Sequence, residues 1–429
     1  MNIYLLLELI ILIFIISLLI TRDIFSPACI MCETYILATI SAIYNIEKWG
    51  MNLHDNTTCI IFLGIASFVV VSVIISLYYK LNIKSKVDKK ELKFIKYHKK
   101  TMLILIAFQG VCLFIYFYFF IKALGDLSRF DGLNHLMRYF RLYVDVEEDI
   151  PLLVNQLIKY SKAMAYICGY IFVHNKIITI KTKTKAHDNF LLISLLIFIA
   201  NSLLTAGRFE MMLLILSLVV MWYIVMLYYS EKGISINTIL KLIIILLLAI
   251  ILFVVTKTIV GRTGEVSVLD DFTEYFGGSI QIFDTYMQEE QVPNKQELFS
   301  GILKLLRKFK LLEMQTVDTG LATYVEVNGI VIGNVYTGFR KIHHDFGVFG
   351  IMIFQMLQAI ILTIYYEKIK GMKNINNVST SIIFYAAISF SLFFHSYSEF
   401  FYSVILSFNY IAFLVMLLII KYIVTKIKV

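Results

Sequence analysis

The stretch from Ile3 to Ile20, IYLLLELIILIFIISLLI, decides the fold class of this chain. A helix needs about 20 apolar residues to cross roughly 30 Å of hydrocarbon, and this stretch approaches that length with Glu8 as its one charged residue. Similar blocks recur along the 429 residues, which are 59% hydrophobic and only 16% charged. A soluble domain has about 25% charged residues and cannot bury so much apolar surface. The sequence therefore predicts an all-α polytopic membrane protein.

About eleven transmembrane helices are expected. No repeat or low-complexity linker divides the chain, so residues 1–429 are predicted to form a single integral membrane domain. The fifth span is the least certain, because Lys159 and Lys162 interrupt it. The predicted spans are 3–20, 27–46, 59–79, 101–121, 152–173, 188–206, 210–229, 238–258, 346–366, 379–395 and 401–420.

The orientation follows from the lysines. The loop 80–100 carries nine lysines against two acidic residues, and cationic loops resist translocation, so it is predicted to be cytoplasmic. Counting spans from there places the basic loops 174–187 and 367–378 and the C-terminus in the cytoplasm as well. The N-terminus and the long segment 259–345 are then outside. The net charge of +9 is interpreted as this topology signal, and no nucleic-acid partner is expected.

Cations on the predicted outer face are the first functional candidates. Arg208, Arg262 and Arg340 lie in outer segments, and Lys159 is predicted to lie about 10 Å below the outer surface. Guanidinium groups suit phosphate, and charges at depth usually face a polar cavity. Any one of them can equally be an interfacial anchor that reaches lipid headgroups. Arg208 and Arg262 together favour a site for a lipid-linked pyrophosphate.

The outer segment 259–345 is predicted to be an ordered, functional loop, because connections of such length are rare in compact domains. Its aromatic and acidic residues suit a carbohydrate, with rings against sugar faces and carboxylates for hydroxyl groups. Residues 300–312 are predicted to form an amphipathic helix near the membrane surface. No phosphate-binding loop, zinc motif or nucleophile-elbow motif occurs, so neither a metal nor a cofactor is expected.

Five short motifs resemble one known family. The first two are GNVYTGFR at 333–340, followed by DFGVFG at 345–350. The others are DIFSP at 23–27, AGR at 206–208 and YFGGS at 275–279. In this order of spans and loops they resemble the bacterial oligosaccharide repeat-unit polymerases, the Wzy-type O-antigen polymerases. The similarity covers most of the chain as an order of elements, although each motif is short.

This resemblance implies a C-type glycosyltransferase bundle in the bacterial inner (plasma) membrane. Such enzymes join undecaprenyl-pyrophosphate-linked oligosaccharide repeats outside the membrane into a surface polysaccharide, an O-antigen or a capsule. They move the growing chain onto the newest repeat without a nucleotide sugar or an obligatory metal. The substrate is the expected partner, and a chain-length regulator and a flippase in the same membrane are further partners that the resemblance suggests.

The resemblance also implies site residues. Arg208 and Arg340 match the motifs as pyrophosphate-binding residues, and Arg262 and Lys159 are added on position alone. The candidates for sugar contacts are Asn334, Tyr336 and Tyr275.

A carboxylate or neutral imidazole must accept the proton of the acceptor hydroxyl. Asp345 is the first candidate for this base, His344 the second and Glu399 the third. A structural role remains open, because Asp345 can cap the ninth span and Gly347 with Gly350 can allow close helix packing.

Two other functions remain open. An O-antigen ligase performs the same type of reaction on another acceptor, but tends to show a histidine where this chain has Gly333. A lipid-linked oligosaccharide flippase or another transporter would carry charges near the midplane and related halves, and has no need of a long outer loop.

Overall fold

The computed structural model describes residues 2–82, 91–140, 151–184, 188–204, 208–230, 235–259, 267–289, 297–308 and 324–427. These residues are mostly helical. The chain divides into two compact units, each built from segments that are distant in sequence. Unit 1 comprises residues 1–86, 269–371 and 388–411, and unit 2 comprises residues 87–268, 372–387 and 412–429.

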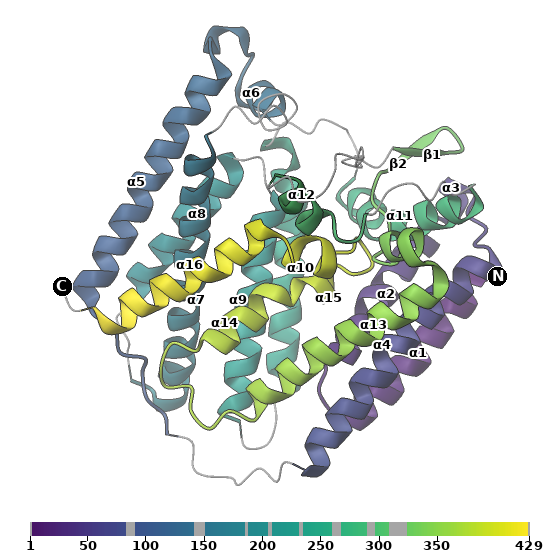
Figure 1. The fold of residues 1–429 in the computed structure, drawn as a ribbon, viewed down its shortest axis with the longest axis horizontal. Coiled ribbons are helices and arrows are strands. Elements are labelled where there is room, and N and C mark those ends of the chain that lie inside the picture. The colour runs from purple at the N-terminus through teal and green to yellow at the C-terminus, as the bar shows by residue number, and fades with distance from the viewer. Residues whose placement is uncertain are drawn as a thin grey trace. The chain divides into compact units, whose positions relative to one another are not determined.

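Unit 1 is built on four long helices that pack side by side (Figure 1). They are α1 (Asn2–Thr21), α2 (Pro27–Tyr44), α4 (Asp55–Asn82) and α13 (Arg340–Lys370). The other elements of unit 1 are α3 (Ile46–Trp49), α11 (Val268–Gln288), α12 (Ser300–Lys308), β1 (Val325–Val327), β2 (Ile330–Gly333), α15 (Phe390–Phe393) and the π-helical turn η4 (Phe401–Ile405).

Unit 2 is also helical, and its central helix α7 (Leu152–Thr182) packs against α5 (Lys99–Leu124), α8 (Leu192–Leu204) and α9 (Arg208–Tyr228). The remaining elements are η1 (Leu127–Arg129), α6 (Leu133–Tyr139), η3 (Asn189–Leu191), α10 (Ile236–Ile259), α14 (Thr380–Ile388) and most of α16 (Phe408–Lys426).

The chain is a helical, membrane-embedded protein. Among the described residues, nine helices are long and apolar enough to cross a membrane, and two shorter apolar helices cover 189–204 and 380–393. Large apolar side chains on these helices face outward, with Leu19 exposed to 70% and Phe114 to 73%. Water would make such surfaces costly, whereas lipid makes them favourable.

The helices follow the predicted spans in order, with three differences. The span predicted at 379–395 is divided at Ser389 into the short helices α14 and α15. The helix predicted at 346–366 begins six residues earlier, as α13, and the span predicted at 401–420 begins with the turn η4 before α16. The uncertain fifth span is a continuous helix, α7. Its Lys162 forms an ion pair of 2.7 Å with Glu210 of α9, which explains how the helix accommodates that charge.

Local sequence signals explain several boundaries. Helix α2 begins at Pro27, and the side chain of Ser26 accepts a hydrogen bond from the backbone of Cys29, a standard helix cap. Strands β1 and β2 form an antiparallel hairpin around Asn328 and Gly329, both with positive φ. Asn-Gly is the preferred pair for such a two-residue turn, so this hairpin was detectable in the sequence although it was not predicted.

The backbone of α13 bends at Gly347, which has φ 64° and ψ −163°. A side chain added at Gly347 would meet nothing within 4 Å, so the expectation that this glycine allows close helix packing is wrong. Its role is conformational, because residues other than glycine rarely adopt this backbone. A methyl group added at Gly350 would lie 2.2 Å from the Cβ of Phe346 in the same helix, so this glycine also shows no close packing against another helix.

Each of the two ends of unit 1 is marked by contacts between different segments. At one end, Asn2 donates to the carbonyl of Leu53, and His54 pairs with Asp284 of α11. At the other end, Lys80 donates to the carbonyl of Ile20. The N-terminal helix and Asp284 of the segment 259–345, both predicted to be outside, therefore lie at one end. We call it the outer end, and the end at Ile20 and Lys80 the basic end.

Candidate functional site

Arg340, at the outer end of unit 1, is held in place by the two residues before it. Phe339 is fully buried, stacks on Tyr35 of α2 at 5.3 Å and fits against Gly64 of α4. The N–H of Gly338 donates to the carbonyl of His395 at 2.7 Å, and a Cβ at this glycine would strike the imidazole ring. The motif at 333–340 thus fixes the backbone position of Arg340 through buried contacts on three other segments.

The guanidinium of Arg340 lies among two tyrosine rings and a carboxylate. It is 4.7 Å from the ring centre of Tyr336 and 5.3 Å from that of Tyr286 on α11. Two of its nitrogens donate to the two oxygens of Glu297, at 2.5 and 3.1 Å. Its Nε has no partner among the described residues. That Nε is buried, but both charged side chains are partly exposed, so the second N–H of each terminal nitrogen is a donor that an incoming anion can use.

Asp345 lies two positions before the kink at Gly347, and its carboxylate is almost completely buried. It accepts hydrogen bonds from the backbone N–H groups of Glu297 and Leu298, at 2.9 to 3.1 Å. Asp345 therefore does not cap its own helix, as one interpretation of the sequence had it. It caps the segment leading into α12, and so fixes the residue that pairs with Arg340.

His344 lies between these groups. Its Nδ1 is 2.9 Å from Oδ1 of Asp345, and its Nε2 is 4.0 Å from Oε1 of Glu297. An ionised carboxylate only accepts hydrogen bonds, so the proton of this contact lies on Nδ1. In the neutral imidazole Nε2 then carries the lone pair, the arrangement of a histidine that a carboxylate orients as a general base.

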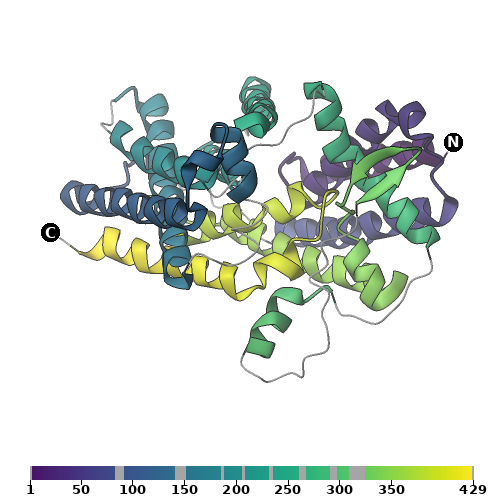
Figure 2. The same ribbon diagram turned by 90° about the horizontal axis from the view of Figure 1, so that it is seen from above.

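The tyrosines are positioned by close packing of α11. A Cβ at Gly277 would come within 2.4 to 2.8 Å of the α2 backbone at Ser41 and Ala42. A Cβ at Gly278 would lie 2.8 Å from Ile332, in β2 of the hairpin. Figure 2 shows the hairpin next to α11. The two glycines of the YFGGS motif thus bring α11 against α2 on one side and the hairpin on the other.

Tyr286 stays a neutral phenol in this site. Burial raises the pKa of its hydroxyl above the ordinary value, although the charge of Arg340 acts in the opposite direction. Its ring packs edge-on against the rings of Tyr336 and His343. Neutral aromatic faces of this kind suit the apolar faces of sugar rings.

Glu399, the third base candidate, occupies a different position in unit 1. Its buried carboxylate accepts from the backbone of Tyr402 at 2.7 Å and of Ser403 at 2.8 Å, so it caps the turn η4. Burial raises the pKa of this carboxyl, while those hydrogen bonds and the charge of Lys341 oppose the rise.

The residues predicted to contact sugar lie in different parts of unit 1. Tyr336 lies against Arg340, whereas Tyr275 packs against Tyr397 at 6.3 Å in the segment before η4. Asn334 directly follows strand β2, two positions before Tyr336.

The remaining cations belong to unit 2. Arg208 opens α9, is 3% exposed, donates to the carbonyl of Phe253 at 2.9 Å and lies over that ring at 4.5 Å. Lys159 donates to Gln156 at 3.0 Å on its own helix, α7. Arg262 lies outside the described residues. The structure thus gives Arg208 an internal carbonyl partner, and a pyrophosphate role for these three residues stays a prediction.

Glu297 and His395 are the polar site residues that the sequence analysis missed. Neither belongs to a recognisable motif, and each becomes important only through a contact with a distant segment. Tyr286 was one aromatic residue among several in the outer segment. Its spacing of 11 residues from Tyr275 places the two on different parts of α11, and no local pattern marks one as the partner of Arg340.

Comparison with family models, with curated proteins and with solved structures finds no match for this chain. The class that the fold defines is a polytopic helical membrane protein. The resemblance to the polymerase family rests on the sequence motifs and stays a prediction.

Proposed function

We propose that this chain is a polymerase that joins undecaprenyl-pyrophosphate-linked oligosaccharide repeats into a surface polysaccharide at the outer side of the membrane. One observation carries the proposal. Arg340, the last residue of the GNVYTGFR motif, lies between two tyrosine rings and beside the His344–Asp345 pair. Anion recognition, sugar-compatible rings and a proton acceptor thus occur together in unit 1.

Arg340 is assigned to the pyrophosphate. A guanidinium donates hydrogen bonds in a planar fork that matches phosphate oxygens, and it keeps its charge at any pH the protein meets. Glu297 uses one side of that fork and balances its charge. Substrate phosphate therefore competes with Glu297 or shares the guanidinium with it, and the nearby tyrosine rings accept the first sugars.

The proton-accepting role is assigned to His344, which sequence analysis ranked second. Asp345, ranked first, already accepts three backbone contacts and the imidazole N–H, so its geometry supports an orienting role. Glu399 is similarly occupied with backbone N–H groups of η4. Nε2 of His344 is the acceptor with the fewest competing contacts, and it lies close to the Arg340–Glu297 pair.

The proposed reaction is a transfer to a hydroxyl group. A hydroxyl of the newest repeat gives its proton to Nε2 of His344 as its oxygen attacks the anomeric carbon of the growing chain. The bond between that carbon and the pyrophosphate oxygen breaks, and undecaprenyl pyrophosphate leaves with its charge stabilised by Arg340. The proposed reaction needs no nucleotide, metal or redox partner.

Arg208, Arg262 and Lys159 are proposed as further contacts for the lipid-linked pyrophosphate. The support is their sequence position and, for Arg208, its match to the AGR motif. The described contacts of Arg208 and Lys159 are internal to unit 2.

Analysis of lipid-linked saccharides in cells that lack the gene tests the proposal. The account expects single lipid-linked repeats to accumulate at the outer face while longer chains disappear, and expects the intact gene to restore them. Repeats that accumulate at the inner face would identify a flippase. Long lipid-linked chains that are not transferred onward would identify a ligase, and either result would contradict the proposal.

A further inference from the structure

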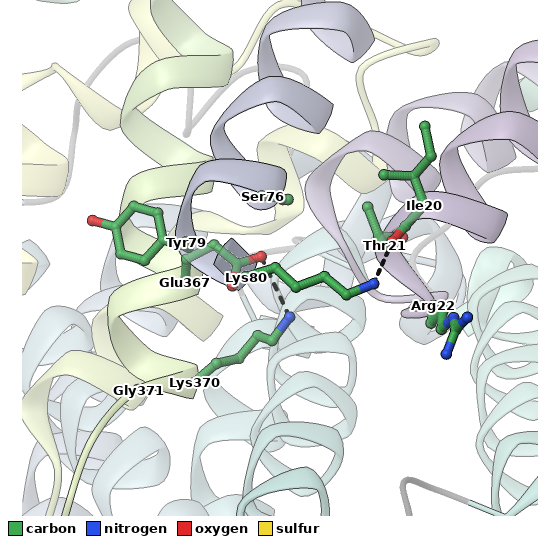
Figure 3. Close-up of a pocket in the computed structure, with 9 residues that line it drawn as sticks. All are labelled: Ile20, Thr21, Arg22, Ser76, Tyr79, Lys80, Glu367, Lys370 and Gly371. Atoms are coloured by element: carbon green, nitrogen blue, oxygen red, sulfur yellow. Dashed lines mark hydrogen bonds and ion pairs between the residues drawn. The ribbon is translucent and has the colours of Figure 1, made fainter. Parts of the chain in front are cut away.

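The basic end of unit 1 contains a pocket of about 320 Å³ that the proposed polymerase reaction does not use. Three helices meet there: the C-terminal ends of α1, α4 and α13 (Figure 3). A cation lies at or just after each of these ends: Arg22 just after α1, Lys80 on α4 and Lys370 on α13.

The charges around the pocket leave a positive balance. Lys370 pairs with Asp23 at 3.1 Å and with Glu367 at 3.3 Å, and Tyr366 also donates to Asp23. Those two carboxylates are therefore engaged by Lys370. Lys80 donates to a neutral group, the carbonyl of Ile20 at 3.4 Å, and Figure 3 shows its side chain extending into the pocket. Arg22 forms no ion pair within the described part of the chain.

A buried serine lines the same pocket. Ser76 is 6% exposed and lines the wall, and its Oγ has no hydrogen-bond partner among the described residues. Leaving a buried hydroxyl without a partner costs free energy, so such groups usually signal a ligand or an ordered solvent molecule. A hydroxyl group near two cations suits an oxyanion, because it can donate a hydrogen bond to an anionic oxygen.

The backbone of Arg22 gives independent support. It has a φ of 55°, a conformation that glycine or asparagine usually adopts after a helix, and its N–H donates to Leu18 to end α1. Arginine at this position is strained, and strained positions cluster at ligand sites. The sequence keeps a cation at the pocket edge where glycine would fit the backbone better.

We infer that this pocket binds the phosphate of an anionic lipid headgroup. Arg22 and Lys80 supply the charge, and Ser76 supplies a hydrogen bond to a phosphate oxygen. Lipid is the favoured source of the phosphate because the residues next to the lining are apolar and exposed: Leu19 to 70% and Leu81 to 77%. These surfaces can contact the acyl chains while the headgroup occupies the pocket. The inference does not rest on the polymerase proposal.

The test uses the purified full-length chain in a neutral detergent. The unfolding temperature is measured as dioleoyl phosphatidylglycerol is added in increasing amounts. Dioleoyl phosphatidylcholine and sodium phosphate are the other two probes. The wild type is expected to be stabilised in a saturable manner by phosphatidylglycerol only. Arg22→Gly and Lys80→Gln should each raise the apparent Kd at least about tenfold, the loss of one charge-assisted contact.

Arg22→Gly separates binding from folding. Glycine adopts the observed φ without strain, so this variant should be at least as stable as the wild type without lipid and yet respond weakly to it. Lys48→Gln, which removes a cation at the outer end, is the matched control and should bind as the wild type does. Equal responses of all four proteins would overturn the site. Saturable binding of sodium phosphate without a preference for phosphatidylglycerol would overturn the assignment to a lipid.

Discussion

Asp345 and Glu297 are 48 residues apart in the sequence, and the carboxylate of Asp345 accepts the backbone N–H of Glu297 with both of its oxygens, at 3.1 and 3.0 Å. The side chain of Glu297 in turn holds the guanidinium of Arg340. The His344–Asp345 pair, Glu297 and Arg340 are therefore parts of one connected group. A substitution of Asp345, Glu297 or Arg340 should therefore change the positions of the other two side chains.

Arg340→Ala is expected to lower polymer formation about ten- to a hundredfold, because the loss of a charge-assisted contact costs about 1.5–3 kcal/mol. Arg340→Lys should restore activity only in part, since lysine keeps the charge and loses the fork. Polymer length and amount, normalised to inserted protein, are the measurement. Arg129→Ala, at a surface arginine of unit 2, is the control. Wild-type polymer from Arg340→Ala would remove this residue from the substrate site.

His344→Gln and Asp345→Asn are expected to reduce polymer formation by a factor on the order of 10² or more. The asparagine amide can donate to Nδ1 and so favour the wrong tautomer, while its oxygen can still accept a backbone N–H. Protein abundance should therefore change little in Asp345→Asn. Normal polymer from Asp345→Asn would leave Asp345 with its capping role alone, and normal polymer from His344→Gln would direct the search for a base to Glu399.

Gly277→Ala is expected to destabilise unit 1 by about 1–3 kcal/mol, the usual cost of forcing an extra group into a packed interface. The added methyl group would meet the backbone of α2, which cannot move as a flexible side chain can. Unfolding temperature in detergent is the measurement. Gly110→Ala in α5 is the matched control, because nothing lies within 4 Å of its added Cβ. Equal unfolding temperatures for both variants would contradict the close approach of α11 to α2.

A reporter enzyme fused after residue 90 is expected to lie in the cytoplasm, and one fused near residue 290 outside. The physical reason is the resistance of the lysine-rich loop 80–100 to translocation. A cytoplasmic location for residue 290 would place the Arg340 group on the wrong side for an extracytoplasmic polymerase.

The sequence predicted the helices well because each span is a long apolar block with local start signals such as Ser26-Pro27. It also predicted Arg340 and Tyr336 as site residues, since the two lie four positions apart in one motif. The pairing of Arg340 with Glu297, and of Asp345 with the Glu297 backbone, joins distant segments and leaves no local pattern. The kink at Gly347 was similarly hidden, because a glycine in a helical pattern favours packing and conformational interpretations equally.

Reconstitution of the purified protein with lipid-linked repeats tests the proposed polymerase activity. Undecaprenyl-pyrophosphate-linked repeats extracted from cells lacking the gene are added to proteoliposomes without nucleotide sugar, and the products are separated by length. We expect a ladder of saccharides that grows by one repeat at a time, with undecaprenyl pyrophosphate released at each step and little product from Arg340→Ala or His344→Gln. Products that never exceed a single repeat with the folded wild-type protein would contradict it.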